Sequence, residues 1–142
     1  MARNKLKVLF DTNIILDVLQ ERKEFYDFSA RLLAYAETGA IEGWLAAHSV
    51  TTLFYLIARD RSAEHARVAL TSLMQFMKIA PVDQSTIEGA LNLPYRDFED
   101  AVQMMAAVQV RVDYVLTRNV RDYQPAPMEV IQPVDLAAIL SG

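Results

Sequence analysis

The sequence contains no cysteine and only two histidines, His48 and His65. A disulfide framework, a thiolate zinc site and a cysteine nucleophile are therefore excluded, and a three-histidine metal site cannot be built. Internal repeats, low-complexity segments and linkers are also missing from the 142 residues. At roughly 150 residues per domain, this length predicts one domain over residues 1–142, with a core that needs no cross-links.

An excess of basic charge is absent too, because 14 lysines and arginines stand against 18 acidic residues and give a net charge of −4. This balance argues against a broad basic surface for tight, sequence-independent nucleic-acid binding, but it permits a phosphate substrate bridged by a metal ion. The first apolar run ends at Asp11 and is too short for a membrane span or a signal peptide. We therefore expect a cytoplasmic protein, and the 53% apolar share permits a homodimer interface.

Short apolar segments alternate with amphipathic ones along the chain. Strands are expected at residues 6–10, 44–47, 79–82, 114–117 and 130–131. The clearest helix runs from Phe25 to a glycine cap at Gly39, and others are expected to open at Ser49, at Ser62, at a capping box over residues 85–88, after residues 97–100 and at residue 134. This alternation predicts an α/β fold with a central parallel sheet of about five strands covered by helices on both faces.

Four aspartates fall where such a sheet binds ligands. Asp11 directly follows the first strand, Asp122 lies in the turn after the fourth, and Asp97 and Asp100 open the helix that feeds the fourth strand. Mg²⁺ prefers oxygen ligands, and two such ions can activate water and stabilise the leaving oxygen of a phosphodiester. Four converging carboxylates would raise the pKa of at least one of them, so we expect Mg²⁺ to stabilise the fold.

A purely structural explanation of the same residues stays open at this stage. Asp97 is a suitable helix N-cap, with Asp100 favoured by the helix dipole, and Asn119 with Asp122 forms a second possible cap.

Other polar residues carry weaker signals. Asp17 and Glu21, one helical turn apart, are expected on a solvated face, and His48 is expected at a strand end and not as a ligand. Arg118 and Arg121 lie in a turn, where they either contact phosphates or are simply exposed.

Taken in order, these segments resemble the PIN-domain family, and most closely its toxin branch. The resemblance rests on an apolar strand ending in D-T-N at residues 11–13, a D-F-E-D-A block at residues 97–101 and a T-R-N-x-x-D-Y turn at residues 117–123. These motifs span the chain from Leu6 to about Pro133. The family implies an α/β/α sandwich of three layers and an endoribonuclease that depends on Mg²⁺ or Mn²⁺.

The resemblance also implies roles for particular residues. The acids that would hold the metal ion are Asp11, Asp97, Asp100 and Asp122. The polar residues that would orient ligands or substrate are Asn13, Thr117, Arg118 and Asn119. Partners implied by the family are an RNA substrate, an antitoxin protein that covers the acidic site and a second copy of the chain, with no membrane.

One position departs from the family. Many PIN toxins carry a glutamate in the helix after the second strand, whereas residues 49–55 contain no acid and Tyr55 is expected at that position. A phenol is a far poorer Mg²⁺ ligand than a carboxylate at neutral pH, so Asp97 would have to substitute.

The leading hypothesis is therefore a metal-dependent endoribonuclease that cleaves RNA phosphodiesters and serves as the toxin of a toxin–antitoxin pair. A non-catalytic PIN-like module that binds RNA or protein is the alternative, motivated by the missing glutamate. A dehalogenase-like phosphatase ranks third, because Asn13 stands where that chemistry needs a second aspartate.

Overall fold

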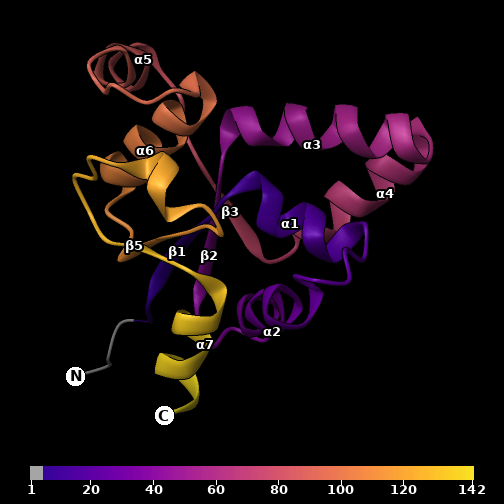
Figure 1. The fold of residues 1–142 in the computed structure, drawn as a ribbon. Coiled ribbons are helices and arrows are strands. Elements are labelled where there is room, and N and C mark those ends of the chain that lie inside the picture. Colours follow the sequence, from indigo (N-terminus) through magenta and orange to yellow (C-terminus); the bar gives the residue numbers. More distant parts are fainter. Residues whose placement is uncertain (1–4) are drawn as a thin grey trace.

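The computed structural model describes residues 5–142, and the ribbon is shown in Figure 1. Strands lie at β1 (Lys7–Phe10), β2 (Glu42–Ala46), β3 (Met77–Ala80), β4 (Tyr114–Leu116) and β5 (Val130–Ile131). Helices lie at α1 (Thr12–Leu19), α2 (Tyr26–Glu37), α3 (Ala47–Asp60), α4 (Ala63–Met74), α5 (Gln84–Leu91), α6 (Phe98–Val110) and α7 (Pro133–Ser141), with a 3₁₀ turn η1 at Val120–Tyr123.

The strands form one parallel sheet in the order β3-β2-β1-β4-β5. From β1 the chain crosses outward to β2 and β3, then returns to place β4 on the other side of β1. The strand order therefore reverses between β1 and β4, which is the point where parallel sheets bind ligands at their carboxyl ends. Phe10 pairs with Leu116, so β1 and β4 end level with each other.

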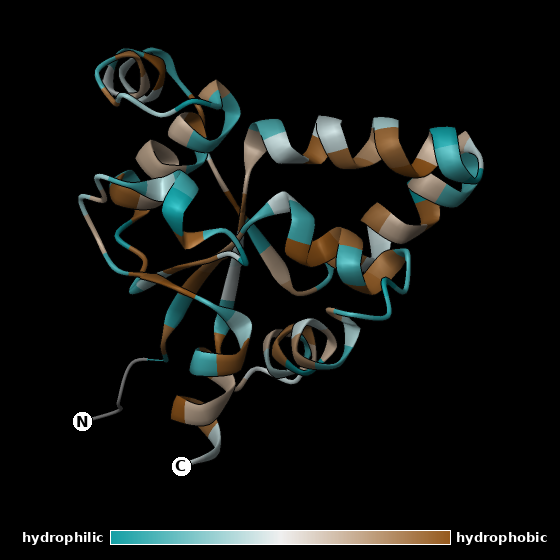
Figure 2. Cartoon of the chain, viewed as in Figure 1, coloured by the Kyte–Doolittle hydropathy of each residue, from teal (hydrophilic) through white to brown (hydrophobic). Residues whose placement is uncertain are grey.

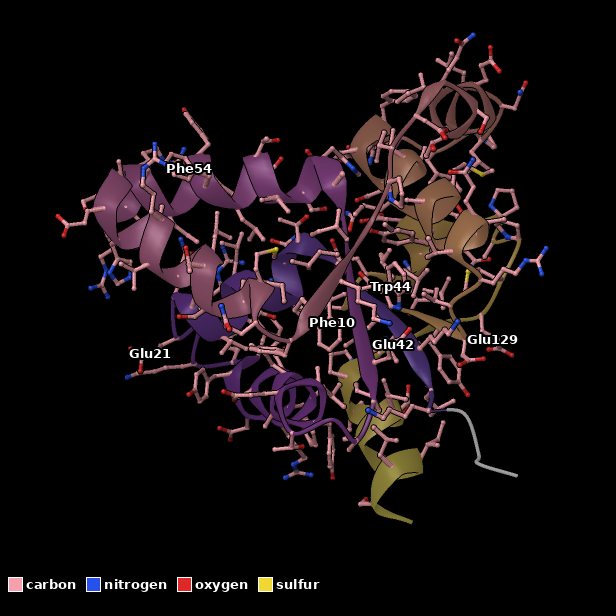
Figure 3. The ribbon with its side chains drawn as sticks, turned by 180° about the vertical axis from the view of Figure 1, so that it is seen from behind. Phe10, Glu21, Glu42, Trp44, Phe54 and Glu129 are labelled. Carbon is pink, nitrogen blue, oxygen red and sulfur yellow. The ribbon has the colours of Figure 1, made fainter. Side chains whose placement is uncertain are left out.

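Helices cover both faces of the sheet, giving three layers. In Figure 1, α1 to α4 lie on one side of the strands and α5 with α6 on the other. Alternate residues of β1 serve the two layers: Val8 and Phe10 pack with the α1–α4 and α7 side, and Leu9 packs against α6. Figure 2 shows hydrophobic segments, in brown, both in the central strands and along the helices beside them, and Figure 3 shows Phe10 at the centre of the molecule. The expected α/β/α sandwich is confirmed.

Two expected helix caps are wrong. Ser49 lies inside α3, because the helix begins at Ala47 directly after β2, and its buried hydroxyl accepts a hydrogen bond from Thr12. The capping box opens at Asp83, whose carboxylate accepts from the Thr86 backbone N–H, since aspartate is an effective cap two residues ahead of the expected Ser85. The third strand also lies two residues earlier than expected. Within residues 5–142, no helix has both the length and the apolar character needed to cross a membrane.

Candidate metal site

A cavity of about 180 Å³ opens where β1 and β4 end. Five acidic side chains line it: Asp11, Asp97, Glu99, Asp100 and Asp122. The fold therefore brings together the four aspartates that the sequence singled out, and it adds Glu99. The polar part of the wall is completed by Thr12, Asn13, Thr52, Asn119 and Tyr123.

Asp11 is the most firmly held of these acids. Its backbone N–H continues the sheet by donating to the Leu116 carbonyl at 2.9 Å, which places its carboxylate beside Thr117. The Thr117 hydroxyl donates to Oδ2 at 2.8 Å and the Gln103 amide donates to Oδ1 at 3.1 Å. Burial raises the pKa of Asp11, and these hydrogen bonds partly oppose the rise. With only 3% of its surface exposed, the side chain has a fixed orientation.

Asp100 is the acid that most clearly records the crowding of charge. It lies in the first turn of α6, where the Tyr123 hydroxyl donates to Oδ1 at 3.2 Å. Burial, followed by the nearby carboxylates of Asp11, Asp97 and Asp122, raises its pKa to about 7. The carboxyl of Asp100 therefore keeps its proton to a higher pH than an ordinary aspartate.

Asp97 is a helix cap that also lines the pocket. It is the N-cap of α6, and its Oδ1 accepts from the Glu99 backbone N–H at 2.9 Å. It also lines the acidic pocket and contributes to the raised pKa of Asp100. The cap fixes where α6 begins, and so sets the position of Asp100 one turn into the helix.

Gln103 and Tyr123 are site residues that the sequence analysis missed. Gln103 bridges the centre by donating to both Asp11 and the Tyr123 hydroxyl, the latter at 3.2 Å. Burial, with the adjacent charges of Asp11 and Asp100, raises the pKa of Tyr123, so it acts as a neutral donor. Its ring packs edge-on against Tyr95 at 6.0 Å. Gln103 follows Asp100 by three residues, a helical spacing that places both on one face of α6 and was visible in the sequence.

Glu99 was also missed as a site residue. Its carboxylate lines the pocket and accepts a hydrogen bond from the Thr52 hydroxyl of α3 at 2.9 Å. The expectation that Tyr55 faces the site from α3 is wrong. Tyr55 is 63% exposed, whereas Thr52 and Leu56, one helical turn apart, are the α3 residues that line the pocket.

The expected orienting residues fall into two groups. Asn13 and Asn119 line the pocket, and Thr117 binds both Asp11 and the Asn119 backbone N–H, the latter at 3.1 Å. Arg118, in contrast, does not line it: its guanidinium forms two hydrogen bonds with Asp17, at 2.9 and 3.1 Å.

That contact also corrects the expectation for Asp17. Its side chain is fully buried and paired with arginine, and it does not belong to a solvated face. The α1 helix packs against α2 around it, and Ser29 of α2 donates to its carboxylate at 3.3 Å.

The chemistry of the donors fits a hard divalent cation. Every side-chain ligand that the pocket offers is an oxygen from a carboxylate, an amide or a hydroxyl. Over residues 5–142, none of the five pocket acids has a lysine, arginine or histidine nitrogen within 4.0 Å. In the same residues, no group of three or more acidic or histidine side chains is placed so that these side chains alone could hold a metal ion. Mg²⁺ commonly keeps several waters, so a site of this kind suits it.

The fold and the site together define a class of protein: a parallel α/β/α sandwich with an acidic pocket at the point where the strand order reverses. Residues 7–121 match the family model described as PIN domain. The match covers well over half of the sequence, and the chain belongs to the PIN-domain family.

The chain is also similar to individual proteins. It is 21% identical to "Ribonuclease VapC1" of Aquifex aeolicus over 127 residues, covering 86% of this chain and 88% of that protein. A solved toxin–antitoxin complex from Klebsiella pneumoniae matches with a TM-score of 0.68 and 22% identity, covering 89% of this chain and 97% of that one. The Mycobacterium tuberculosis VapC20, described as a sarcin-ricin loop cleaving toxin, matches with a TM-score of 0.62 and 14% identity, covering 76% and 86%.

Proposed function

We propose that the protein is a ribonuclease that depends on Mg²⁺ or Mn²⁺ and cleaves RNA phosphodiesters. The observation that carries the proposal is a pocket of five acids with no built-in cation among residues 5–142, in which the pKa of Asp100 is raised to about 7. Repulsion between crowded carboxylates destabilises a fold unless a bound cation compensates it. Membership in the PIN-domain family and the similarity to a ribonuclease support the same function.

The proposed metal ligands are Asp11, Asp97, Asp100 and Asp122. A divalent cation bound there supplies Lewis-acid stabilisation to phosphodiester oxygens and lowers the pKa of water. The chain itself orients Asp11 through Thr117 and Gln103, and it keeps Asp100 in place with a neutral tyrosine hydroxyl. A cation bound there would take the place of the proton that the raised pKa of Asp100 lets its carboxyl keep.

Asn13, Thr117 and Asn119 are proposed to orient the ligands and the substrate. Arg118 shares this role indirectly, because its ion pair with Asp17 fixes the backbone between Thr117 and Asn119. Its guanidinium is engaged within the chain, so we assign it no phosphate contact.

The biological role that we propose is the toxin of a toxin–antitoxin pair, acting in the cytoplasm as a single PIN-like domain over residues 1–142. Similarity to chains from toxin–antitoxin complexes supports an antitoxin partner. We propose that this partner covers the acidic pocket. A homodimer is proposed as well, because the apolar share of the sequence permits such an interface.

The test compares cleavage of a mixed pool of single-stranded and structured RNA in Mg²⁺, Mn²⁺ or EDTA. We expect metal-dependent cleavage by the wild type and a loss of at least about 100-fold in Asp100→Asn, the size expected when an electrostatic contribution of several kcal/mol is removed. Asp135→Asn is a matched control, because Asp135 also lies in the first turn of a helix but is exposed. Cleavage unaffected by Asp100→Asn or by EDTA would overturn the proposal, and RNA binding without cleavage would favour a non-catalytic module.

A further inference from the structure

The two sides of the acidic pocket are joined by contacts between α3 and the start of α6. Thr52 of α3 donates its hydroxyl proton to Glu99 Oε2 at 2.9 Å. One turn earlier in α3, His48 Nε2 lies 3.1 Å from the Glu99 backbone carbonyl. Because a carbonyl only accepts, this contact places the imidazole proton on Nε2. α3 therefore holds both the main chain and the carboxylate of a single α6 residue.

These contacts aim Glu99 into the pocket and not into solvent. A glutamate in the first turn of a helix usually extends into water, where the helix dipole favours it without further contacts. Glu64 is such a residue, exposed in the first turn of α4. Glu99 occupies the same position of α6 but is half-buried, lines the cavity and has its Oε2 bound by Thr52.

We infer that Glu99 is a fifth carboxylate ligand of the divalent cation, delivered from α6 and positioned by Thr52 and His48 of α3. The inference rests on the proposed function, which assigns the cation to this pocket. Thr52 orients Glu99 by engaging Oε2, which leaves Oε1 without a hydrogen bond among residues 5–142. The helix that carries no acid over residues 49–55 thus contributes a hydroxyl that holds a carboxylate from elsewhere.

A purely structural role for Glu99 gives a different outcome, which a set of variants separates. Glu99→Gln removes the charge but keeps an oxygen that accepts from Thr52, so a structural link between α3 and α6 would survive. Thr52→Val removes the hydroxyl while keeping the shape, and Thr52→Ser restores it. Glu64→Gln is the matched control, because it removes a first-turn glutamate that has no place in the pocket.

The primary readout is binding of Mn²⁺ alone, followed by electron paramagnetic resonance and calorimetry without RNA. We expect Glu99→Gln to weaken Mn²⁺ binding by about 10- to 100-fold, Thr52→Val to weaken it by up to about 10-fold, and Thr52→Ser to restore it. Glu64→Gln should stay within about twofold. In RNA cleavage, Glu99→Gln should raise the Mn²⁺ concentration needed for half-maximal rate more than it lowers the rate at saturating Mn²⁺.

The Asp100→Asn variant separates failure of this inference from failure of the proposed function. If Asp100→Asn loses Mn²⁺ while Glu99→Gln binds it like the wild type, Glu99 is not a ligand and the inference is overturned. If Asp100→Asn and Glu99→Gln both bind Mn²⁺ and cleave RNA like the wild type, the proposed function fails together with the inference about Glu99. Should Glu99→Gln not fold, the Thr52→Val and Thr52→Ser pair decides, because unchanged Mn²⁺ binding in both would overturn the inference.

Discussion

Two groups of carboxylates lie beside the residues that follow β4, and only one of them is paired with cations of the chain. Thr117 donates to Asp11 in the acidic pocket, and the next residue, Arg118, pairs with Asp17 behind it. Asp17 is fully buried and has two arginines of its own, with Arg118 at 2.9 Å and Arg22 at 3.5 Å. The pocket acids have no such cation among residues 5–142. The buried carboxylate of Asp17 is paired within the chain, whereas the carboxylates that we propose as metal ligands are left available.

The largest expected effect comes from breaking the internally paired centre. Arg118→Met should destabilise the protein by about 3 kcal/mol, because it leaves a buried carboxylate with only the more distant Arg22. It also removes the contact between the guanidinium and the Phe25 ring, whose centroid lies 3.8 Å away. Urea denaturation followed by circular dichroism measures the change.

Two further variants test the cause of that loss. Arg61→Met removes an exposed pair with Asp60 at 3.8 Å and should cost less than about 0.5 kcal/mol. Adding Asp17→Asn to Arg118→Met should recover part of the stability, since the uncompensated charge is gone. Equal losses in the single and double variants would show that lost packing, and not charge, explains the effect.

The second effect is stabilisation of the acidic pocket by added cation. At about 100 times its dissociation constant, Mg²⁺ or Mn²⁺ should stabilise the wild type by about 2.7 kcal/mol, roughly 8 °C in Tm. Asp100→Asn should lose most of this shift. Asp17→Asn should melt at a lower temperature yet keep the full shift, because its centre takes no external cation. Thermal melts with KCl at matched ionic strength control for screening, and an equal shift in KCl would contradict a specific site.

A smaller effect should appear in the pH dependence of the metal-free protein. The pKa of Asp100 is about 7 in the fold and 3.8 ordinarily, so the native state binds more protons than the unfolded state between these values. The contribution of Asp100 to stability therefore falls as pH rises from about 4 to 7, and the full penalty remains above pH 7. After allowance for solvent screening, we expect a loss of about 1 kcal/mol between pH 5 and pH 8.

Asp100→Asn should remove this penalty and so raise the Tm of the metal-free protein at pH 8, and by a smaller amount at pH 5, where only part of the penalty has developed. Saturating Mg²⁺ should also make the stability of the wild type depend less on pH between pH 5 and pH 8, since a bound cation takes the place of the proton on Asp100. Melts of both proteins in EDTA at the two pH values make the comparison. If the difference in Tm between the wild type and Asp100→Asn is the same at both pH values, the pocket does not crowd negative charge around Asp100.

The sequence was a good guide to the architecture because the sheet is buried on both faces. Continuous apolar runs such as Val8 to Phe10 are typical of parallel strands, and this run is followed by a polar residue where the strand ends. Asp11 was located in this way, whereas the role of Thr117 came from the resemblance to the PIN-domain family. Their contact then follows from the register that pairs Phe10 with Leu116.

What the sequence did not reveal depends on how separate helices approach each other. Glu99 looked like one more acid in a helix start, and only the approach of α3 brings Thr52 within 2.9 Å of it. Arg118 and Asp17 are 101 positions apart, so neither gave any local sign of its partner. Charged side chains in turns and first helical turns carry no period that distinguishes a solvated face from a buried pair, unlike the apolar stripe of a helix.

The smallest effect tests which side of α3 faces the pocket. Tyr55→Ala should change RNA cleavage and Mn²⁺ binding by less than about twofold, because Tyr55 is exposed and its ring packs against Arg59 at 5.7 Å. Thr52 and Leu56 share the face that lines the pocket. Tyr55 lies about 60° around the helix from Thr52, on the side away from Leu56. The same cleavage and Mn²⁺ assays used for Thr52→Val make the comparison direct. A loss in Tyr55→Ala as large as in Thr52→Val would contradict this assignment. It would mean that the exposed face of α3, which carries Tyr55, also contacts the RNA or the metal ion.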